Sequence, residues 1–233
     1  MFGTVHRIAH DGSSQAEFVT GLTGGVRSIA FDPYGLYGNK MIVATNAGRV
    51  YTGSNTGVAT LLANVGEDAE GLSCAPQAFG GYATGTLFVA SEGSGSLRAI
   101  APDGSQITVI SGLRGAEMVS FVPLNLGSSG NPAEGFYAAS YPSNVQKADA
   151  SGFTAYMGDA IITGETGHEV WRLTWNGSAL VSSVLGSFPG QPEDGIFVTA
   201  DLIKPPISEP GTWALMVSGL GLLTSLARRR NGR

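Results

Sequence analysis

Short runs of β-branched and aromatic residues alternate with Gly, Asn, Asp and Pro turns over residues 1–203. Runs of this length between turn residues are typical of short β-strands, and no long helical periodicity interrupts them. The turns agree with this interpretation, because Asp103-Gly104 and Asn176-Gly177 separate neighbouring runs where a tight hairpin needs positive φ. The pattern therefore predicts an all-β body.

The runs also recur in units of about four. The first two units are complete, with runs at 27–33, 40–45, 48–51 and 58–62, and at 70–76, 86–91, 95–100 and 106–110. A third unit has runs at 117–123 and 135–140, and a further unit has runs at 159–164, 168–173 and 180–184. Four strands per unit of roughly 40 to 50 residues are typical of β-propeller blades. We predict about five to six four-stranded blades, with a compact five-bladed ring or a β-sandwich as alternatives.

The two ends of the body are expected to meet in one blade. Residues 4–8 and 16–19, joined by Asp11-Gly12, have the pattern of two outer strands. Their inner strand is predicted at 194–199, which would close the ring and remove exposed sheet edges.

The end of the chain has a different pattern. An uncharged apolar run from Thr212 through Leu226 to Ala227 is followed by Arg228-Arg229-Arg230. As a helix this run is roughly 24 Å long, less than a hydrocarbon core of about 30 Å. Trp213 suits the interface and the arginine stems can reach the headgroups, so the segment can cross with its ends included. We predict a propeller over 1–203, a linker over 204–211 and a transmembrane helix with a basic stop over 212–233; the alternative is a buried C-terminal core helix.

This tail resembles a known sorting signal. The order Ser208-Glu209-Pro210, Thr212-Trp213-Ala214-Leu215, Gly-rich apolar helix and arginine cluster is similar to the PEP-CTERM signal of Gram-negative bacteria, over residues 208–230. Glu209 and Pro210 match that motif, whereas Ser208 stands where the family usually has Pro. The resemblance implies export, membrane anchoring, and processing by an exosortase-type membrane protease near the motif. It also implies a place at the cell surface, often beside exopolysaccharide production.

Export also requires an N-terminal signal, and residues 1–7 have no basic segment followed by an apolar one. Either another route is used or the start lies inside a longer gene. We favour the second explanation, because a missing N-terminal piece also accounts for an incomplete ring of blades.

Charge narrows the choice of partner. Residues 1–211 contain nine of the 13 Lys and Arg residues and all 18 Asp and Glu residues, a net charge of −9. Such a body would be repelled by phosphates, so nucleic acid is not an expected partner. It is compatible with cation binding or with a solvated surface. Cys74 is the single cysteine, which excludes an intrachain disulfide, and we interpret it as a small buried residue.

Acidic residues recur at the start of the predicted inner strands. Glu70, Glu117 and Glu193 or Asp194 occupy equivalent positions, and Arg27 takes this place in the first unit. The first side chains of inner propeller strands face the central channel, where carboxylates can bind Ca²⁺ or another divalent ion through oxygen. We name Glu70, Glu117 and Asp194 as a candidate metal set. The alternative is that these acids only solvate the channel mouth.

The body also resembles a known class of propeller. Glu70-Gly71-Leu72 and Pro192-Glu193-Asp194-Gly195-Ile196 are similar to openings in six-bladed propellers of the gluconolactonase and NHL-repeat type. In gluconolactonase-like enzymes a comparable carboxylate helps to hold a divalent metal, with Asn and Asp partners from other blades. The resemblance implies an architecture more than an activity.

Other catalytic signals are weak. His6, His10 and His168 are scattered, no Cys/His metal spacing occurs, and no Gly-x-Ser-x-Gly stands at a strand-to-helix turn. No catalytic residue is therefore predicted. The first hypothesis is a non-enzymatic exported propeller at the cell surface or in the polysaccharide matrix, with an exosortase-type protease and extracellular polysaccharide as partners. The alternative is a metal-dependent lactonase or hydrolase of the gluconolactonase type.

Overall fold

The computed structural model describes residues 2–142 and 144–203, and the first compact unit of the chain ends at Ala200. The predicted linker, the motif Ser208-Glu209-Pro210, Trp213, Leu226 and the stop Arg228-Arg229-Arg230 lie outside the described residues. Within the described ranges no helix is long and apolar enough to cross a membrane.

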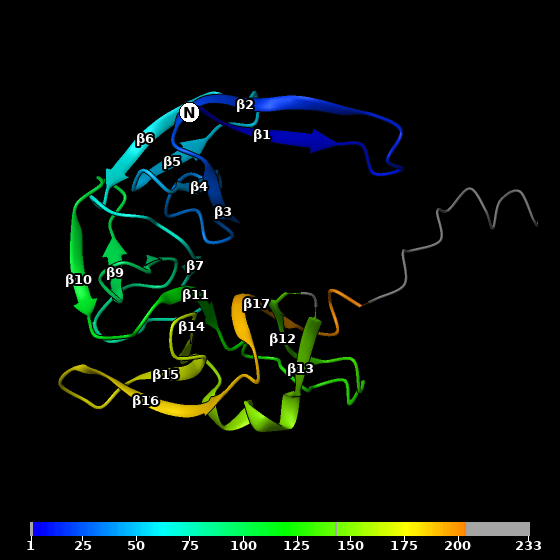
Figure 1. Ribbon diagram of the computed structural model, residues 1–233, viewed down its shortest axis with the longest axis vertical. Helices are drawn as coiled ribbons and strands as arrows, with labels where there is room; N and C mark the ends of the chain where they lie inside the picture. The colour runs from blue at the N-terminus through cyan, green and yellow to red at the C-terminus, as the bar shows by residue number, and fades with distance from the viewer. Residues whose placement is uncertain (1, 143, 204–233) are drawn as a thin grey trace, which may run out of the picture. The chain divides into compact units, whose positions relative to one another are not determined.

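The described chain is all-β and folds into five antiparallel sheets (Figure 1). The first has two strands, β1 (Phe2–Ile8) and β2 (Gln15–Thr23). The second has four strands, β3 (Val26–Phe31), β4 (Met41–Thr45), β5 (Arg49–Gly53) and β6 (Ala59–Asn64). The third also has four, β7 (Leu72–Cys74), β8 (Leu87–Ser91), β9 (Ser96–Ile100) and β10 (Gln106–Ile110).

In the last two sheets the order of the strands differs from their order along the chain. The fourth sheet consists of β11 (Ala116–Phe121), β14 (Ala160–Gly164), β15 (Glu169–Trp175) and β16 (Leu180–Ser187), in that order. The fifth consists of β13 (Asn144–Asp149), β12 (Gly135–Tyr141) and β17 (Gln191–Val198), in that order. Two short 3₁₀ helices, η1 (Ala150–Gly152) and η2 (Thr154–Tyr156), follow β13.

The sheets stack face to face like propeller blades. The burial of the second strand of a blade gives the reason for this stacking. All five residues of β4, of β8 and of β14 are buried. On β8, Leu87 and Val89 pack toward the second sheet, whereas Phe88 and Ala90 pack toward the fourth. Successive side chains of a strand point to opposite faces, so both faces of such a sheet are covered. This stack of more than two sheets confirms an all-β propeller and excludes the β-sandwich alternative.

The inner strands of successive blades are neighbours. β3 contacts β7, β7 contacts β11, and β11 contacts β17. A side-chain bond joins the last pair, because the Ser120 hydroxyl donates to the Gly195 carbonyl oxygen at 2.7 Å. The four inner strands therefore line one central region, as predicted for 27–33, 70–76, 117–123 and 194–199.

The predicted composition of the third unit was wrong. β11 pairs with β14, and the chain between them builds β12 and β13 of the next sheet. The burial patterns give the reason: β14 is buried throughout and suits a position covered on both faces, whereas β12 has two exposed residues. Order along the sequence therefore differs from order in the sheet.

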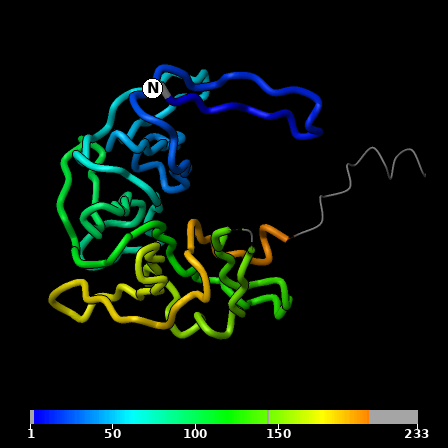
Figure 2. Tube along the Cα trace, viewed as in Figure 1, coloured from blue at the N-terminus to red at the C-terminus, as the bar shows by residue number. Residues whose placement is uncertain are grey.

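The predicted closure of the ring through residues 194–199 was also wrong. β17 pairs with β12 over Gly135↔Val198 to Tyr141↔Gln191, and Figure 2 shows the late segment returning beside the green one. Phe197 packs on Phe136, with ring centroids 4.8 Å apart, and on Phe153 at 5.2 Å. This aromatic cluster gives β17 a buried partner in β12, while β1 and β2 form a sheet with each other.

Candidate functional site

Three carboxylates converge at one end of the inner strands. Glu70, Glu92 and Glu117 each have a carboxylate oxygen within 4.8 Å of the others. Glu70 precedes β7, Glu92 follows β8, and Glu117 is the second residue of β11. Because β7 and β8 are antiparallel, the start of one and the end of the other meet at the same edge. The fold therefore places all three acids at one edge of two adjacent blades.

A β-bulge aims Glu117 at this edge. The pairing of β11 with β14 steps from Ala116↔Gly164 to Met118↔Thr163, which leaves Glu117 as the extra residue. The same irregularity leaves Arg27 unpaired on β3. An unpaired bulge residue bends its strand and redirects its side chain, often beside a functional site. Inner strands β3 and β11 thus each contain a bulge, and in each the bulge places a charged side chain outside the regular alternation of the strand.

Gly71 holds the two predicted acids close together. Its backbone N–H donates a 2.7 Å hydrogen bond to the carbonyl oxygen of Glu117 in the next blade. A Cβ on Gly71 would lie 2.6 Å from the Met118 Cα, so no larger residue fits without moving backbone. The glycine of the Glu-Gly-Leu motif therefore has a packing role, since it lets β7 approach β11.

The cluster carries unbalanced negative charge. Burial raises the pKa of Glu70 to about 7, and the charge of Asp68 adds to this effect while Arg27 opposes it. Burial, followed by the charges of Glu70 and Glu165, raises the pKa of Glu117 to about 9. Each carboxylate makes ionisation of its neighbours harder, as expected for like charges in a partly desolvated site.

One arginine compensates part of this charge. Arg27 Nη2 lies 2.6 Å from Asp68 Oδ2, and its Nε lies 3.1 Å from Glu70 Oε1. Arg27, at the start of the first predicted unit, thus pairs with Glu70, at the start of the second.

The acidic edge continues into the fourth and fifth sheets. Glu165 follows β14 as Glu92 follows β8, and burial, then a hydrogen bond to Glu92 and its charge, raises the pKa of Glu165 to about 7. The Gln191 side-chain amide donates to Glu165 and, at 3.1 Å, to Glu193 Oε1. Acids from three blades therefore form a continuous edge.

The predicted metal set is only partly assembled. The structure brings Glu70 and Glu117 together, while Asp194 lies outside the group of three and is exposed. Sequence reasoning missed Glu92 and Glu165. Comparing the repeats would have found them, because each is the first residue after the second strand of its blade, where the first blade has Asn46.

The geometry of the cluster fits a divalent ion. Ca²⁺ binds oxygen at about 2.3–2.6 Å, so two ligands on opposite sides of one ion are separated by roughly 5 Å. The carboxylate oxygens here lie within 4.8 Å of one another. An all-carboxylate donor set suits hard cations such as Ca²⁺, Mg²⁺ or Mn²⁺. A dication would also offset the burial and the neighbouring negative charges that raise the pKa of Glu117.

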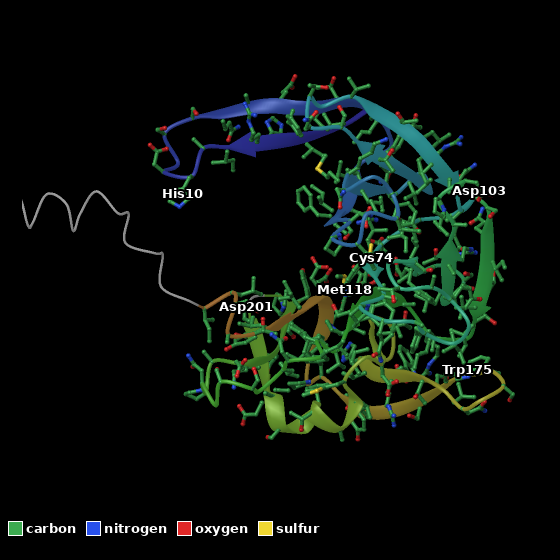
Figure 3. All side chains as sticks on the ribbon, turned by 180° about the vertical axis from the view of Figure 1, so that it is seen from behind. His10, Cys74, Asp103, Met118, Trp175 and Asp201 are labelled. Carbon is green, nitrogen blue, oxygen red and sulfur yellow. The ribbon has the colours of Figure 1, made fainter. Side chains whose placement is uncertain are left out.

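A cavity of about 550 Å³ adjoins this edge. Arg27, Met118 and Asp194 are among its lining residues, and Figure 3 labels Met118 on the inner side of the blades. Arg27 is also ion-paired to Glu70, so this side chain connects the cavity to the cluster. Its volume lies within the range of about 300–1,000 Å³ usual for small-molecule sites.

The two tryptophans of β15 lie in different surroundings. Trp171 is buried in the core cluster with Phe88 and Leu173, whereas Trp175 is 42% exposed. Packing thus accounts for Trp171. Cys74 is half-buried beside the core of the second and third sheets, and burial raises the pKa of its thiol to about 12.

The comparisons with known proteins gave only distant likenesses. No protein-family model matches the chain, and no curated protein matches its sequence. A catalytically inactive virginiamycin B lyase from Staphylococcus aureus with quinupristin is 12% identical, with a TM-score of 0.43, over 82% of this chain and 66% of the lyase. A putative gluconolactonase is 12% identical, with a TM-score of 0.35, over 72% of this chain and 67% of that one. A protein from Lactobacillus plantarum, also 12% identical, has a TM-score of 0.36 and matches over 84% of this chain and 67% of its own. At these TM-scores the likenesses decide neither fold nor function, and the chain spans about two thirds of the lyase's length.

Proposed function

We propose that this propeller binds a divalent metal ion through Glu70, Glu92 and Glu117 and hydrolyses an ester or lactone beside it. The convergence of three carboxylates, one of them only 6% exposed, is the observation that carries this proposal. Burying charge is costly unless it is paired, and one arginine shared with Asp68 leaves most of this charge unpaired. A bound dication would supply the missing charge.

The residues around the cluster have distinct parts in this proposal. A metal ion bound there would polarise the substrate carbonyl and lower the pKa of a bound water. Arg27 orients Glu70 through their 3.1 Å ion pair, and Gly71 keeps Glu70 beside Glu117. Glu165, held by Gln191 next to Glu92, lies at the same edge and is our candidate proton acceptor.

Metal binding and hydrolysis can be tested separately. Purified protein is stripped with a chelator and titrated with Ca²⁺, Mg²⁺ and Mn²⁺ by calorimetry, and hydrolysis of simple lactones is followed with and without the ion. Glu117→Gln should abolish both signals, whereas Glu17→Gln, an exposed acid on β2, should change neither. Absence of any cation binding would remove the enzymatic proposal.

We also propose that the chain is exported and sorted through residues 208–230, with an exosortase-type membrane protease as partner. The order of motif, apolar run and arginine stop supports this proposal. A C-terminal apolar helix, a ring of five to six blades and a place in the extracellular polysaccharide matrix belong to the same hypothesis. Cation binding without hydrolysis would favour the non-enzymatic form of this exported propeller.

The sorting proposal is tested by fractionating cells that express a tagged chain. Replacement of Arg228-Arg229-Arg230 by Asn should shift the protein between fractions, and Arg233→Asn serves as the matched control at the end of the chain. An unchanged location for the triple variant would contradict the role of the tail.

A further inference from the structure

The cavity beside the carboxylate cluster has mostly apolar walls. They come from β3, β11, β12, β13 and β17, so residues far apart in the sequence meet there. Its larger apolar side chains are Val26, Ile29, Met118, Val145 and Ile196. Ala138 and Ala139 of β12 also line the cavity.

Three of these apolar side chains are exposed to solvent. Ile29 is 44% exposed, Ile196 is 58% exposed and Val145 is 72% exposed. A single exposed aliphatic residue is ordinary, but three from three strands around one cavity form a patch. Burial of such side chains under a ligand would remove apolar surface from water, which favours an apolar occupant.

Arg27 connects the cavity to the carboxylate cluster. Arg27 lines it and reaches Glu70 at 3.1 Å, and Met118 lines it directly after Glu117. A molecule with its carbonyl at the carboxylates would extend its remaining part along the apolar wall. A polyhydroxylated ring would find partners among Arg27, Ser28, Tyr137 and Asp194 of the lining, but it would leave the apolar surface of Ile29, Val145 and Ile196 facing polar groups.

Building on the proposed function, we infer that the substrate is an amphiphilic acyl lactone or ester whose hydrocarbon chain occupies this cavity, rather than a sugar lactone. In the reaction, water adds to the carbonyl carbon and the bond from that carbon to the ring oxygen breaks. The departing oxygen takes a proton, and the product is a hydroxy acid. No oxidant or further reactant is needed.

The test compares two lactones that share a ring and differ by a six-carbon chain, γ-decalactone and γ-butyrolactone. Each buried methylene is expected to improve kcat/KM about fourfold, so the longer substrate should be preferred by about a hundredfold or more. The paired substitution Ile196→Thr with Val145→Thr keeps β-branched side chains at exposed positions and should reduce this preference about tenfold. Val184→Thr, at a 60% exposed position on β16 outside the cavity lining, is the matched control.

Failure of this inference can be distinguished from failure of the proposed function. Hydrolysis of both lactones with equal kcat/KM, or an unchanged preference in the double variant, would overturn the substrate class and leave the hydrolase standing. If neither lactone is hydrolysed, the proposed function fails. Binding of the same two lactones to protein in chelator then tests whether the cavity is an apolar ligand site. Tighter binding of γ-decalactone that weakens in the double variant supports an apolar ligand site, and equal binding overturns it.

Discussion

The Gly71 amide donates a 2.7 Å hydrogen bond to the Glu117 carbonyl oxygen, which joins the inner strands of two adjacent blades. The contact depends on the missing side chain of Gly71, because a Cβ there would lie 2.6 Å from Met118 Cα and 2.7 Å from Val119 N. The hydrogen bond also sets the separation of Glu70 and Glu117, because Glu117 accepts it and Glu70 directly precedes its donor, Gly71. Blade packing and the carboxylate cluster therefore share one structural constraint.

Gly71→Ala should destabilise the protein by about 3 kcal/mol, because the added methyl group meets backbone rather than a flexible side chain. It should also weaken cation binding by moving Glu70 away from Glu117. Urea unfolding and calorimetric titration measure the two effects. Gly186→Ala on β16 is the control, since its Cβ would meet nothing within 4 Å and its stability should change by no more than about 1 kcal/mol. Equal stability of the two variants would contradict the packing role of Gly71.

In the presence of chelator, the free energy of unfolding should fall as pH rises. The pKa of Glu117 rises on folding from an ordinary 4.5 to about 9, so the folded chain holds more protons than the unfolded chain between these values. The stability that this proton provides is complete below about pH 4.5 and is lost as pH rises through about 9. Glu70, with its pKa raised to about 7, contributes in the same direction.

Chemical denaturation at several pH values in chelator measures this slope. Glu117→Gln, which cannot ionise, should be more stable than the unmodified chain at pH 8 and about equal to it at pH 5. The exposed-position variant Glu17→Gln should keep the full slope. A slope that survives in Glu117→Gln would mean that other groups cause it.

Adding Ca²⁺ to the chelated protein should raise its melting temperature more at pH 8 than at pH 5. The ion requires ionised carboxylates, so it competes with the protons held by Glu70 and Glu117. Stabilisation by a ligand of the folded state grows with the ratio of ligand concentration to Kd, by about 2.7 kcal/mol at a hundredfold excess. Melting curves over a range of Ca²⁺ concentrations at both pH values check this expectation. A larger shift at pH 5 would exclude the cluster as the binding site.

Arg27→Gln should have opposite effects on stability and on cation affinity. Removing the guanidinium leaves Asp68 and Glu70 uncompensated, which destabilises the metal-free protein by about 1 kcal/mol, a modest value because Arg27 is 42% exposed. The same loss of a competing positive charge should tighten Ca²⁺ binding by about fivefold. Calorimetry and urea unfolding of one variant measure both changes. Arg49→Gln on β5 is the comparison, since Arg49 forms none of the ion pairs seen among the described residues. Weaker Ca²⁺ binding by Arg27→Gln would contradict this prediction, because it would mean that the orientation of Glu70 by Arg27 outweighs the effect of its charge.

Sequence alone determined the strands of the first two blades and the inner position of Glu70 and Glu117. These features follow from local patterns, because alternation predicts which positions are buried and turn residues mark the ends of the strands. Repetition of the unit likewise predicted a propeller. The sorting role of residues 208–230 is likewise a prediction from the sequence.

Only the tertiary structure decided which strands pair and which acids meet. Alternation identifies the faces of a strand but not its partner. β12 pairs with β17, and Phe136 packs on Phe197 there, although the predicted units did not place these strands together. Glu92 joins Glu70 and Glu117 because the end of β8 and the start of β7 share an edge. That proximity arises from sheet pairing and blade packing between distant segments, and no local pattern contains it.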